Sequence, residues 1–258
     1  MALLNNFKLG VRSYGDAHRF IRKHRLWGYV FLPALINAVL VTILAIGSWH
    51  LIANFSNLIF DSLGLSGETG GWLSYLFSFL RFLIKALFWM LLFMLYSYVF
   101  KYIVLIILSP MLAILSEKTA HLLTGAAYPF SFKNFIHDVW RGIRIALRNT
   151  FVELGWILLF WIIGFIPIIG FISPVFLFFV SCYFYGFSMI DYNNERNRLS
   201  IRESIRFVRK NRGLAVANGM IFYLVFFFVP IIGFLVAPAY AIVAATLAVH
   251  ETANKNQT

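Results

Sequence analysis

Long apolar stretches, separated by short basic or polar segments, dominate this chain. Four regions are poor in Asp, Glu, Lys and Arg, and they run over 26–60, 72–123, 154–190 and 213–250. A bilayer core about 30 Å thick needs roughly 20 helical residues, and each region supplies more than that. The pattern therefore predicts an all-α, polytopic integral membrane protein.

We expect one membrane domain made of five segments. They are a basic N-terminal segment (1–25), helix one (26–52), a long second helix (72–123), an amphipathic helix with a first hairpin (134–190), and an amphipathic helix with a second hairpin (195–250). Lys101 lies in the middle of the second helix. An intramembrane cation is costly and normally has a role or a partner, so Lys101 is a candidate for a solute pathway.

The third and fourth regions break at the same short motif, FIPIIGFISP over 165–174 and FVPIIGFLVAP over 228–238. The two copies share a proline (Pro167 and Pro230) and a glycine (Gly170 and Gly233), and each ends in a further proline (Pro174 and Pro238). Proline ends an incoming helix and glycine permits a reversal, so the two motifs predict a pair of helical hairpins.

The depth of these hairpins is left open by the sequence. The first incoming arm offers only about 13 residues before Pro167, or roughly 20 Å of helix, which suggests that the hairpins penetrate the membrane halfway. Broken hairpins in two parts of one chain point to a transport site, which makes Gly170 and Gly233 pathway candidates. Two ordinary hairpins with tight turns explain the pattern equally well.

The charge of the chain is strongly positive, with 22 Lys and Arg against 10 Asp and Glu. Basic residues crowd 1–25 and 191–213, whereas 53–72 contains none. By the positive-inside rule the N-terminus is cytoplasmic, and both termini are cytoplasmic if each hairpin returns to its side of entry. Orientation and contact with anionic lipids account for the basic balance, so no nucleic-acid partner is expected.

Two basic amphipathic helices are expected at the membrane surface. The arginines concerned are Arg141, Arg144 and Arg148 in the first, and Arg198, Arg202, Arg206 and Arg209 in the second, which covers 195–212. Both patterns are typical of headgroup binding, and an anion-attracting vestibule is the alternative.

The residue pattern gives no indication of a catalytic site. No His, Cys and carboxylate cluster has metal-ligand spacing, no Gly-rich loop opens a nucleotide site, and no Ser lies in a nucleophile elbow. We therefore expect no catalytic residue, no metal and no cofactor, and the chain is not expected to be an enzyme. The nearest acidic pair, Asp191 and Glu195, is expected to form a capping and salt-bridge device.

Several segments, in this order, carry a family resemblance. They are SPMLAILSEKTAHLLTG from 109, FIPIIGFISPVF from 165, GFSMIDYNNERNRLSIRE from 186 and APAYAIVAAT from 237. From Gly10 to Glu251 the chain resembles the CysZ-type sulfate permeases, which are grouped with the etoposide-induced proteins. The resemblance implies a bacterial inner-membrane protein with two long spanning helices and two partly penetrating hairpins. It also implies a homo-oligomer that passes sulfate inward for cysteine synthesis.

The anion motif of that family is altered here. In the family, a Gly, an apolar residue and two adjacent Arg precede a VxLPxxxN segment, and they bind sulfate. YVFLPALIN matches that segment with Pro33 and Asn37, but Trp27 and Gly28 hold the two Arg positions and Arg25 the Gly position. Among the family's other positions, Asp191 begins DYN in place of DYP. The anion-binding candidates are Arg22, Lys23, Arg25, Trp27 and Gly28.

Two functions follow from these observations. The first is a permease or channel for a small inorganic anion, with sulfate as the leading candidate. The second is a non-transporting integral membrane scaffold or lipid-interacting envelope protein, in which the basic helices bind anionic lipids.

Overall fold

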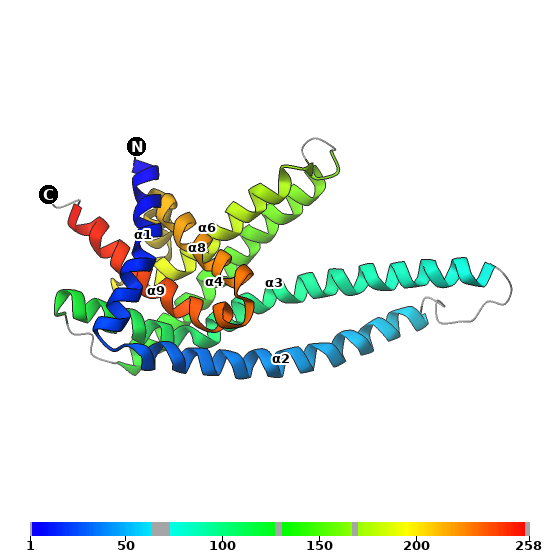
Figure 1. The fold of residues 1–258 in the computed structure, drawn as a ribbon, viewed down its shortest axis with the longest axis horizontal. Helices are drawn as coiled ribbons and strands as arrows, with labels where there is room; N and C mark the ends of the chain where they lie inside the picture. Colours follow the sequence, from blue (N-terminus) through cyan, green and yellow to red (C-terminus); the bar gives the residue numbers. More distant parts are fainter. Residues whose placement is uncertain (1, 63–72, 127–130, 167–169, 256–258) are drawn as a thin grey trace. The chain divides into compact units, whose positions relative to one another are not determined.

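The computed structural model describes residues 2–62, 73–126, 131–166 and 170–255 and is helical throughout them, with no strand in these ranges. In chain order the helices are α1 (Ala2–Lys23), α2 (Trp27–Ser62), α3 (Leu73–Thr124), α4 (Phe132–Ile163), α6 (Ser173–Arg196), α7 (Ile201–Lys210), α8 (Arg212–Phe228) and α9 (Pro230–Lys255) (Figure 1). Stretches of α4, α6 and α9 are long and apolar enough to cross a membrane. The predicted all-α membrane protein is confirmed at this level.

The helices form two compact units. The first joins Met1–Asn37 to Ile106–Thr258, and the second is Ala38–Leu105, which holds the C-terminal part of α2 and the N-terminal part of α3. The two corners and the cavity described below lie in the first unit.

The core of the first unit is the contact between α6 and α8. A Cβ atom on Gly186 would overlap the carbonyl oxygen of Ala215, and one on Gly219 would overlap the carbonyl oxygen of Cys182. Small residues at these points let the two backbones touch, which is the usual way that helices pack in a membrane. The α8 helix also packs against α1 and α9, so it is the central helix of the unit.

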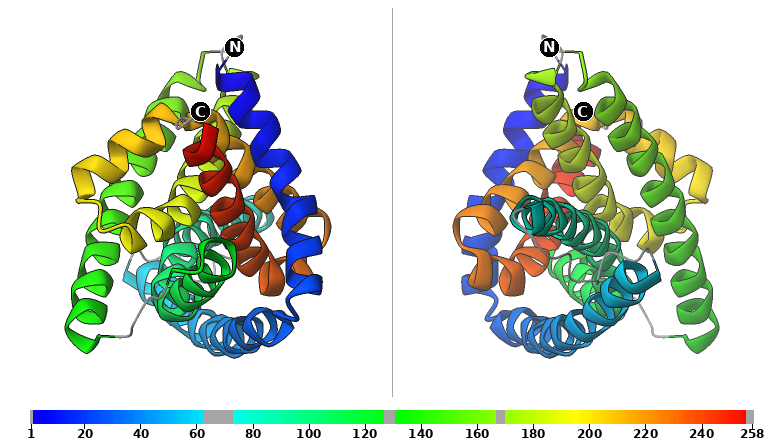
Figure 2. Two further views of the ribbon diagram at one scale, coloured as in Figure 1. Left: turned by 90° about the vertical axis from the view of Figure 1, so that its left-hand side faces the viewer. Right: turned by 90° about the vertical axis from the view of Figure 1, so that its right-hand side faces the viewer.

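The basic N-terminal segment forms α1, an amphipathic helix that packs on α8 and α9. Figure 2 shows α1 alongside α9. Ala17 and Ile21 are fully buried on its inner face. The Tyr14 hydroxyl donates a hydrogen bond to the carbonyl oxygen of Asn218 at 2.8 Å. The basic N-terminal segment therefore belongs to the folded core.

The basic stretch around Arg141 and the apolar arm after it form one continuous helix, α4. The prediction of two separate segments, with an incoming arm of only about 13 residues, is therefore wrong. No proline lies between 131 and 163, so nothing in the chain forces a break there. The candidate span within this helix is Ile136–Ile163, 28 residues long.

The first reversal uses Gly170. The α4 helix ends with Gly164 as its C-cap, and the Gly170 N–H donates to the carbonyl oxygen of Ile166 at 2.7 Å. A Cβ atom on Gly170 would overlap the carbonyl oxygen of Gly164, so a glycine is required at this position. Pro167 lies outside the described residues, and Pro174 stands in the first turn of α6, where proline is favourable.

The second reversal differs from the prediction. The α8 helix ends at Phe228, Val229 is its C-cap, and α9 begins at once with Pro230. The prediction that Gly233 makes the reversal is wrong, because Gly233 lies in the first turn of α9. Proline has no N–H to leave unpaired and a φ angle suited to a helix start, so the outgoing helix restarts directly at Pro230. Pro238 lies inside α9 and is buried.

Candidate functional site

The corner between α1 and α2 carries the basic residues that the sequence singled out. Arg25 has a φ of 54°, in the left-handed region. The Leu26 N–H donates to the Ile21 carbonyl oxygen at 3.0 Å, and the Arg25 N–H donates to the Arg22 carbonyl oxygen at 3.4 Å. These two bonds make a Schellman motif, in which glycine is the usual left-handed residue. An arginine therefore stands where its own backbone conformation is unfavourable.

The cations of this corner differ in their partners. Arg12 and Arg19 both pair with Asp16 on the same helix. Arg22 and Arg25, one turn further on, are exposed and form no ion pair with any described carboxylate. Lys23 is equally exposed and equally without an ion pair in the described part of the chain. Three exposed cations without an ion pair in the described part of the chain therefore lie in the last turn of α1 and in the turn before α2.

Trp27 packs the corner against the rest of the unit. Its ring lies edge-on to His18 with centroids 6.2 Å apart and stacks on Phe31 at 5.7 Å. His18 in turn stacks on Tyr240 of α9, and its Nδ1 lies 3.0 Å from the Tyr240 hydroxyl. Trp27, which stands where the resemblance places the first arginine of the anion motif, therefore packs the corner against α1 and, through His18, against α9.

Gly28 leaves the start of α2 open. A Cβ atom built on Gly28 would meet nothing within 4 Å. Trp27 and Gly28 are the first two residues of α2, and the first N–H groups of any α-helix have no partner inside the helix. Together with the helix dipole, these groups favour an anion beside the three exposed cations. The corner can therefore bind a small anion by charge and by backbone donors.

The other predicted site positions are not brought to this corner by any described contact. Gly170 lies in the first reversal and Gly233 in the first turn of α9. The side chains of Pro33, Asn37 and Lys101 lie outside the described residues, as does that of Pro230. In the described part of the chain, no group of three or more His, Cys, Asp or Glu side chains is placed to hold a metal ion.

A second corner, between α6 and α7, repeats the backbone motif of the first. Arg198 has a φ of 57°. The Leu199 N–H donates to the Asn194 carbonyl oxygen at 2.9 Å, and the Arg198 N–H donates to the Glu195 carbonyl oxygen at 2.9 Å. The expected amphipathic helix over 195–212 is therefore wrong in extent, because this turn separates α6 from a ten-residue α7.

Unlike Arg25, Arg198 is held by a carboxylate. Its Nη1 donates to both oxygens of Asp138, at 2.7 and 2.9 Å. Asp138 lies on α4, so the pair ties the turn to a neighbouring helix. Arg198 has become part of the fold rather than a free surface cation.

Asp191 forms a salt bridge, as predicted, but its partner is an arginine of another helix. Arg141 of α4 donates from Nη1 and Nη2 to the two Asp191 oxygens, each at 3.0 Å, and both side chains are buried. Its Nε donates to the Leu199 carbonyl oxygen at 3.0 Å, and Glu195 lies 3.6 Å from Nη1. The Ser204 hydroxyl also donates to Asp191. A bidentate arginine thus locks the second corner.

Arg141 was counted with the surface arginines of α4, although its burial demands a carboxylate partner. One sequence feature could have indicated this pairing: Asp191 stands at the end of a long apolar segment. A carboxylate buried there needs a cation from elsewhere in the chain. The 50 residues between Arg141 and Asp191 hide that pairing from any local pattern.

The start of α7 is capped from both sides. The Ser200 hydroxyl accepts from the Glu203 N–H, and the Glu203 carboxylate accepts from the Ser200 N–H at 2.8 Å. The side-chain and backbone hydrogen bonds from Ser200 lower the pKa of Glu203 below its ordinary value. This capping box explains why α7 begins at Ile201 and not at Glu195.

Comparison with known proteins identifies the family. The family described as sulfate transporter CysZ/etoposide-induced protein 2.4 matches residues 13–238. The protein named sulfate transporter CysZ of Pseudomonas fluorescens (strain Pf0-1) is 28% identical over 222 residues, 85% of this chain and 84% of that protein. The protein of the same name in Pseudomonas aeruginosa (strain LESB58) is 23% identical over 240 residues, 92% of this chain and 93% of that protein. The match extends from α1 into α9, and the chain belongs to the sulfate transporter CysZ/etoposide-induced protein 2.4 family.

Proposed function

We propose that this protein is a permease of the bacterial inner membrane that passes sulfate. Family membership and the printed names of its relatives support the reaction class. The observation that carries the proposal is the α1/α2 corner, where exposed cations without ion-pair partners among the described residues directly precede the open start of α2. A sulfate dianion matches that charge and accepts hydrogen bonds on every oxygen.

In this chain the entry site differs from the family's arginine pair. Arg25 and Arg22, with Lys23 beside them, take the place of guanidiniums that would stand at Trp27 and Gly28. Because these cations are exposed, their attraction for sulfate is screened by salt over about 8 Å at physiological ionic strength. We therefore expect the corner to bind sulfate weakly, so that it captures the anion from solution and releases it into the membrane pathway.

Topology follows the positive-inside rule in this proposal. The basic helices α1 and α7 lie on the cytoplasmic side, and both termini lie there with them. The α8 helix has 17 residues, or about 25 Å of rise, which falls short of a hydrocarbon core about 30 Å thick. This length supports a second hairpin that enters the membrane only partway. Assembly into a homo-oligomer, and a pathway past Lys101, Gly170 and Gly233, stay predictions.

Uptake of radiolabelled sulfate into proteoliposomes tests the function. The wild-type protein should give saturable uptake above protein-free vesicles, and a variant with Arg22→Gln, Lys23→Gln and Arg25→Gly should lose it. Arg19→Gln is the matched control, because it removes a cation from the same helix whose charge is already paired with Asp16. We expect this control to keep wild-type uptake.

Two results would overturn the proposal in different ways. Absence of uptake by the wild-type protein would reject the permease and favour the lipid-interacting envelope role. Equal uptake by the wild-type protein and the triple variant would support the permease function but would show that the α1/α2 corner takes no part in it.

A further inference from the structure

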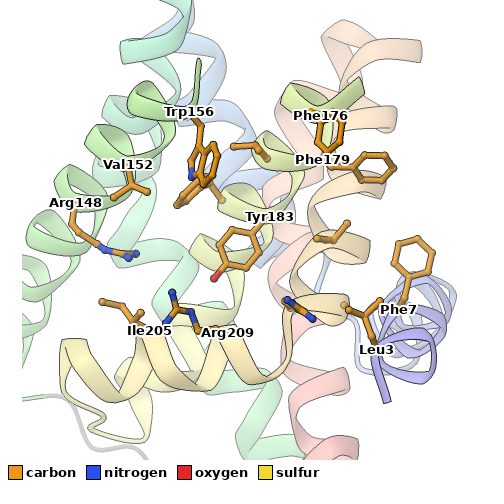
Figure 3. A pocket seen from close by; sticks show the side chains of 15 residues that line it. Leu3, Phe7, Arg148, Val152, Trp156, Phe176, Phe179, Tyr183, Ile205 and Arg209 are labelled. Carbon is orange, nitrogen blue, oxygen red and sulfur yellow. The ribbon is translucent and has the colours of Figure 1, made fainter. Parts of the chain in front are cut away.

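A cavity of about 610 Å³ lies in the first unit between α1, α4, α6, α7 and α8, and none of its lining residues belongs to either corner. Figure 3 shows that its lining is divided: Arg148 and Arg209 lie toward one end, and Trp156, Phe176 and Phe179 toward the other. A cavity that is cationic at one end and aromatic at the other fits an amphipathic anion.

The cationic end carries uncompensated positive charge. Three arginines line it, from α4, α7 and α8: Arg148, Arg209 and Arg212. No acidic side chain lies among the described lining residues, and neither Arg209 nor Arg212 forms an ion pair with a described carboxylate. Arg148 donates to the Asn149 side-chain oxygen at 2.8 Å, and the Tyr183 hydroxyl points toward Arg148 and Arg209 in Figure 3. Arg148, Arg209 and the Tyr183 hydroxyl therefore face the same part of the cavity, and Arg212 also lines it.

The aromatic end lies toward the apolar ends of three helices. Trp156 follows Arg148 by eight residues in α4, which places it about 12 Å further along the helix, toward the apolar end at Ile163. Phe176 and Phe179 lie in the apolar first half of α6, whose charged end is at Arg196. The α8 helix also runs from a cation, Arg212, into an apolar stretch. The cavity therefore runs from the membrane surface toward the hydrocarbon.

We propose that this cavity binds one anionic phospholipid, with its phosphate against the three arginines and an acyl chain along Trp156, Phe176 and Phe179. A free inorganic anion would leave the aromatic half of the cavity without a partner, whereas an acyl chain covers it. A zwitterionic lipid brings no net charge to the three cations, so the site selects anionic headgroups. This site does not depend on the proposed sulfate transport.

The test uses the full-length protein in detergent, with dioleoyl-phosphatidylglycerol and dioleoyl-phosphatidylcholine as probes and native mass spectrometry as the readout. The two lipids share their acyl chains and differ in headgroup charge. We expect one phosphatidylglycerol to stay bound at lipid concentrations where phosphatidylcholine does not. A variant with Arg148→Gln, Arg209→Gln and Arg212→Gln should weaken that binding by about tenfold or more.

A matched control removes three charges outside the cavity from α4 and α7, two of the three helices that carry the cavity arginines. Arg144, Arg202 and Arg206 are exposed and do not line it, so their replacement by Gln should change phosphatidylglycerol binding by less than about twofold. Should the arginine variant fail to fold, Val152→Trp supplies a second test. It fills the cavity beside Trp156 without removing a charge, and it should likewise weaken retention of the lipid.

Three outcomes would overturn the proposal. Equal losses in the cavity variant and the control would mean general electrostatic attraction to the lipid. Equal binding of the two lipids would remove headgroup selection. Displacement of phosphatidylglycerol by millimolar sulfate or inorganic phosphate would assign the arginines to a free anion. Sulfate uptake should be measured on the same variants. Because the α1/α2 corner is intact in all of them, failure of the lipid-site proposal can be distinguished from failure of the sulfate-permease proposal.

Discussion

The α1/α2 corner and the α6/α7 corner use one backbone motif but hold their arginines differently. Arg25 and Arg198 both occupy the left-handed position that closes a Schellman motif, where an L-residue costs about 1 kcal/mol or more. Arg198 offsets that cost through Asp138, and Arg141 locks the turn around it. Arg25 has no described carboxylate beside it. An unfavourable backbone conformation that brings no ion pair to the fold is more easily explained by a role in function. The first corner is therefore the better candidate for solute binding.

The largest effect is expected where the second corner is locked. Arg141→Met leaves Asp191 buried without its cation, and we expect the free energy of unfolding to fall by about 3–5 kcal/mol. Thermal unfolding in detergent, followed by circular dichroism, measures this change. Arg144→Gln, on the same helix but exposed, should change stability by no more than about 0.5 kcal/mol.

A double variant sharpens this first prediction. Adding Asp191→Asn to Arg141→Met removes the stranded charge, so part of the lost stability should return. A loss below about 1 kcal/mol for Arg141→Met alone would mean that the buried pair does not hold the corner.

Transport should separate the two corners most clearly. Glycine suits both left-handed positions, so Arg25→Gly and Arg198→Gly each remove a guanidinium without straining the backbone. We expect Arg25→Gly to lower the kcat/KM of sulfate uptake by about tenfold, because it deletes one charge-assisted hydrogen bond. Arg198→Gly should leave uptake unchanged. Equal losses in the two variants, at equal reconstitution, would break the comparison.

The sequence predicted the helices better than it predicted either corner. Apolar runs fix where helices form in a membrane, and the family resemblance led directly to Arg22, Lys23 and Arg25. The left-handed turns at Arg25 and Arg198 both escaped prediction, because arginine gives no local sign of a position that glycine normally fills. The pairing of Arg141 with Asp191 escaped too, since it is set by the packing of α4 on α6.

Stability should also distinguish the two arginines, by a smaller amount. Arg198→Ala loses a partly exposed ion pair and should cost about 0.5–1 kcal/mol, whereas Arg25→Ala loses no described pair and should stay within about 0.5 kcal/mol of wild type. At both positions glycine should be more stable than alanine by about 1 kcal/mol, because only alanine keeps the left-handed strain. Thermal unfolding of the four variants gives these differences. An Arg25→Ala loss as large as that of Arg198→Ala would show that Arg25 is structural as well.

The smallest effect is a pH dependence confined to the second corner. Hydrogen bonds from Ser200 lower the pKa of Glu203 in the folded protein, so its carboxylate stabilises the cap above its ordinary pKa of 4.5. That contribution is lost as the pH falls through the lowered pKa, when the carboxylate becomes protonated. Ser200→Ala should therefore cost about 1 kcal/mol at neutral pH and less below pH 4.5, as measured by thermal unfolding at both pH values. In a Glu203→Gln background the Ser200→Ala cost should not vary with pH, since glutamine caps without titrating. The first corner closes with no carboxylate in its motif, so Arg25→Ala should show the same stability change at both pH values. A stability change that differs between the two pH values would mean that an acidic group lies beside Arg25. Arg25 would then be held by a carboxylate, as Arg198 is.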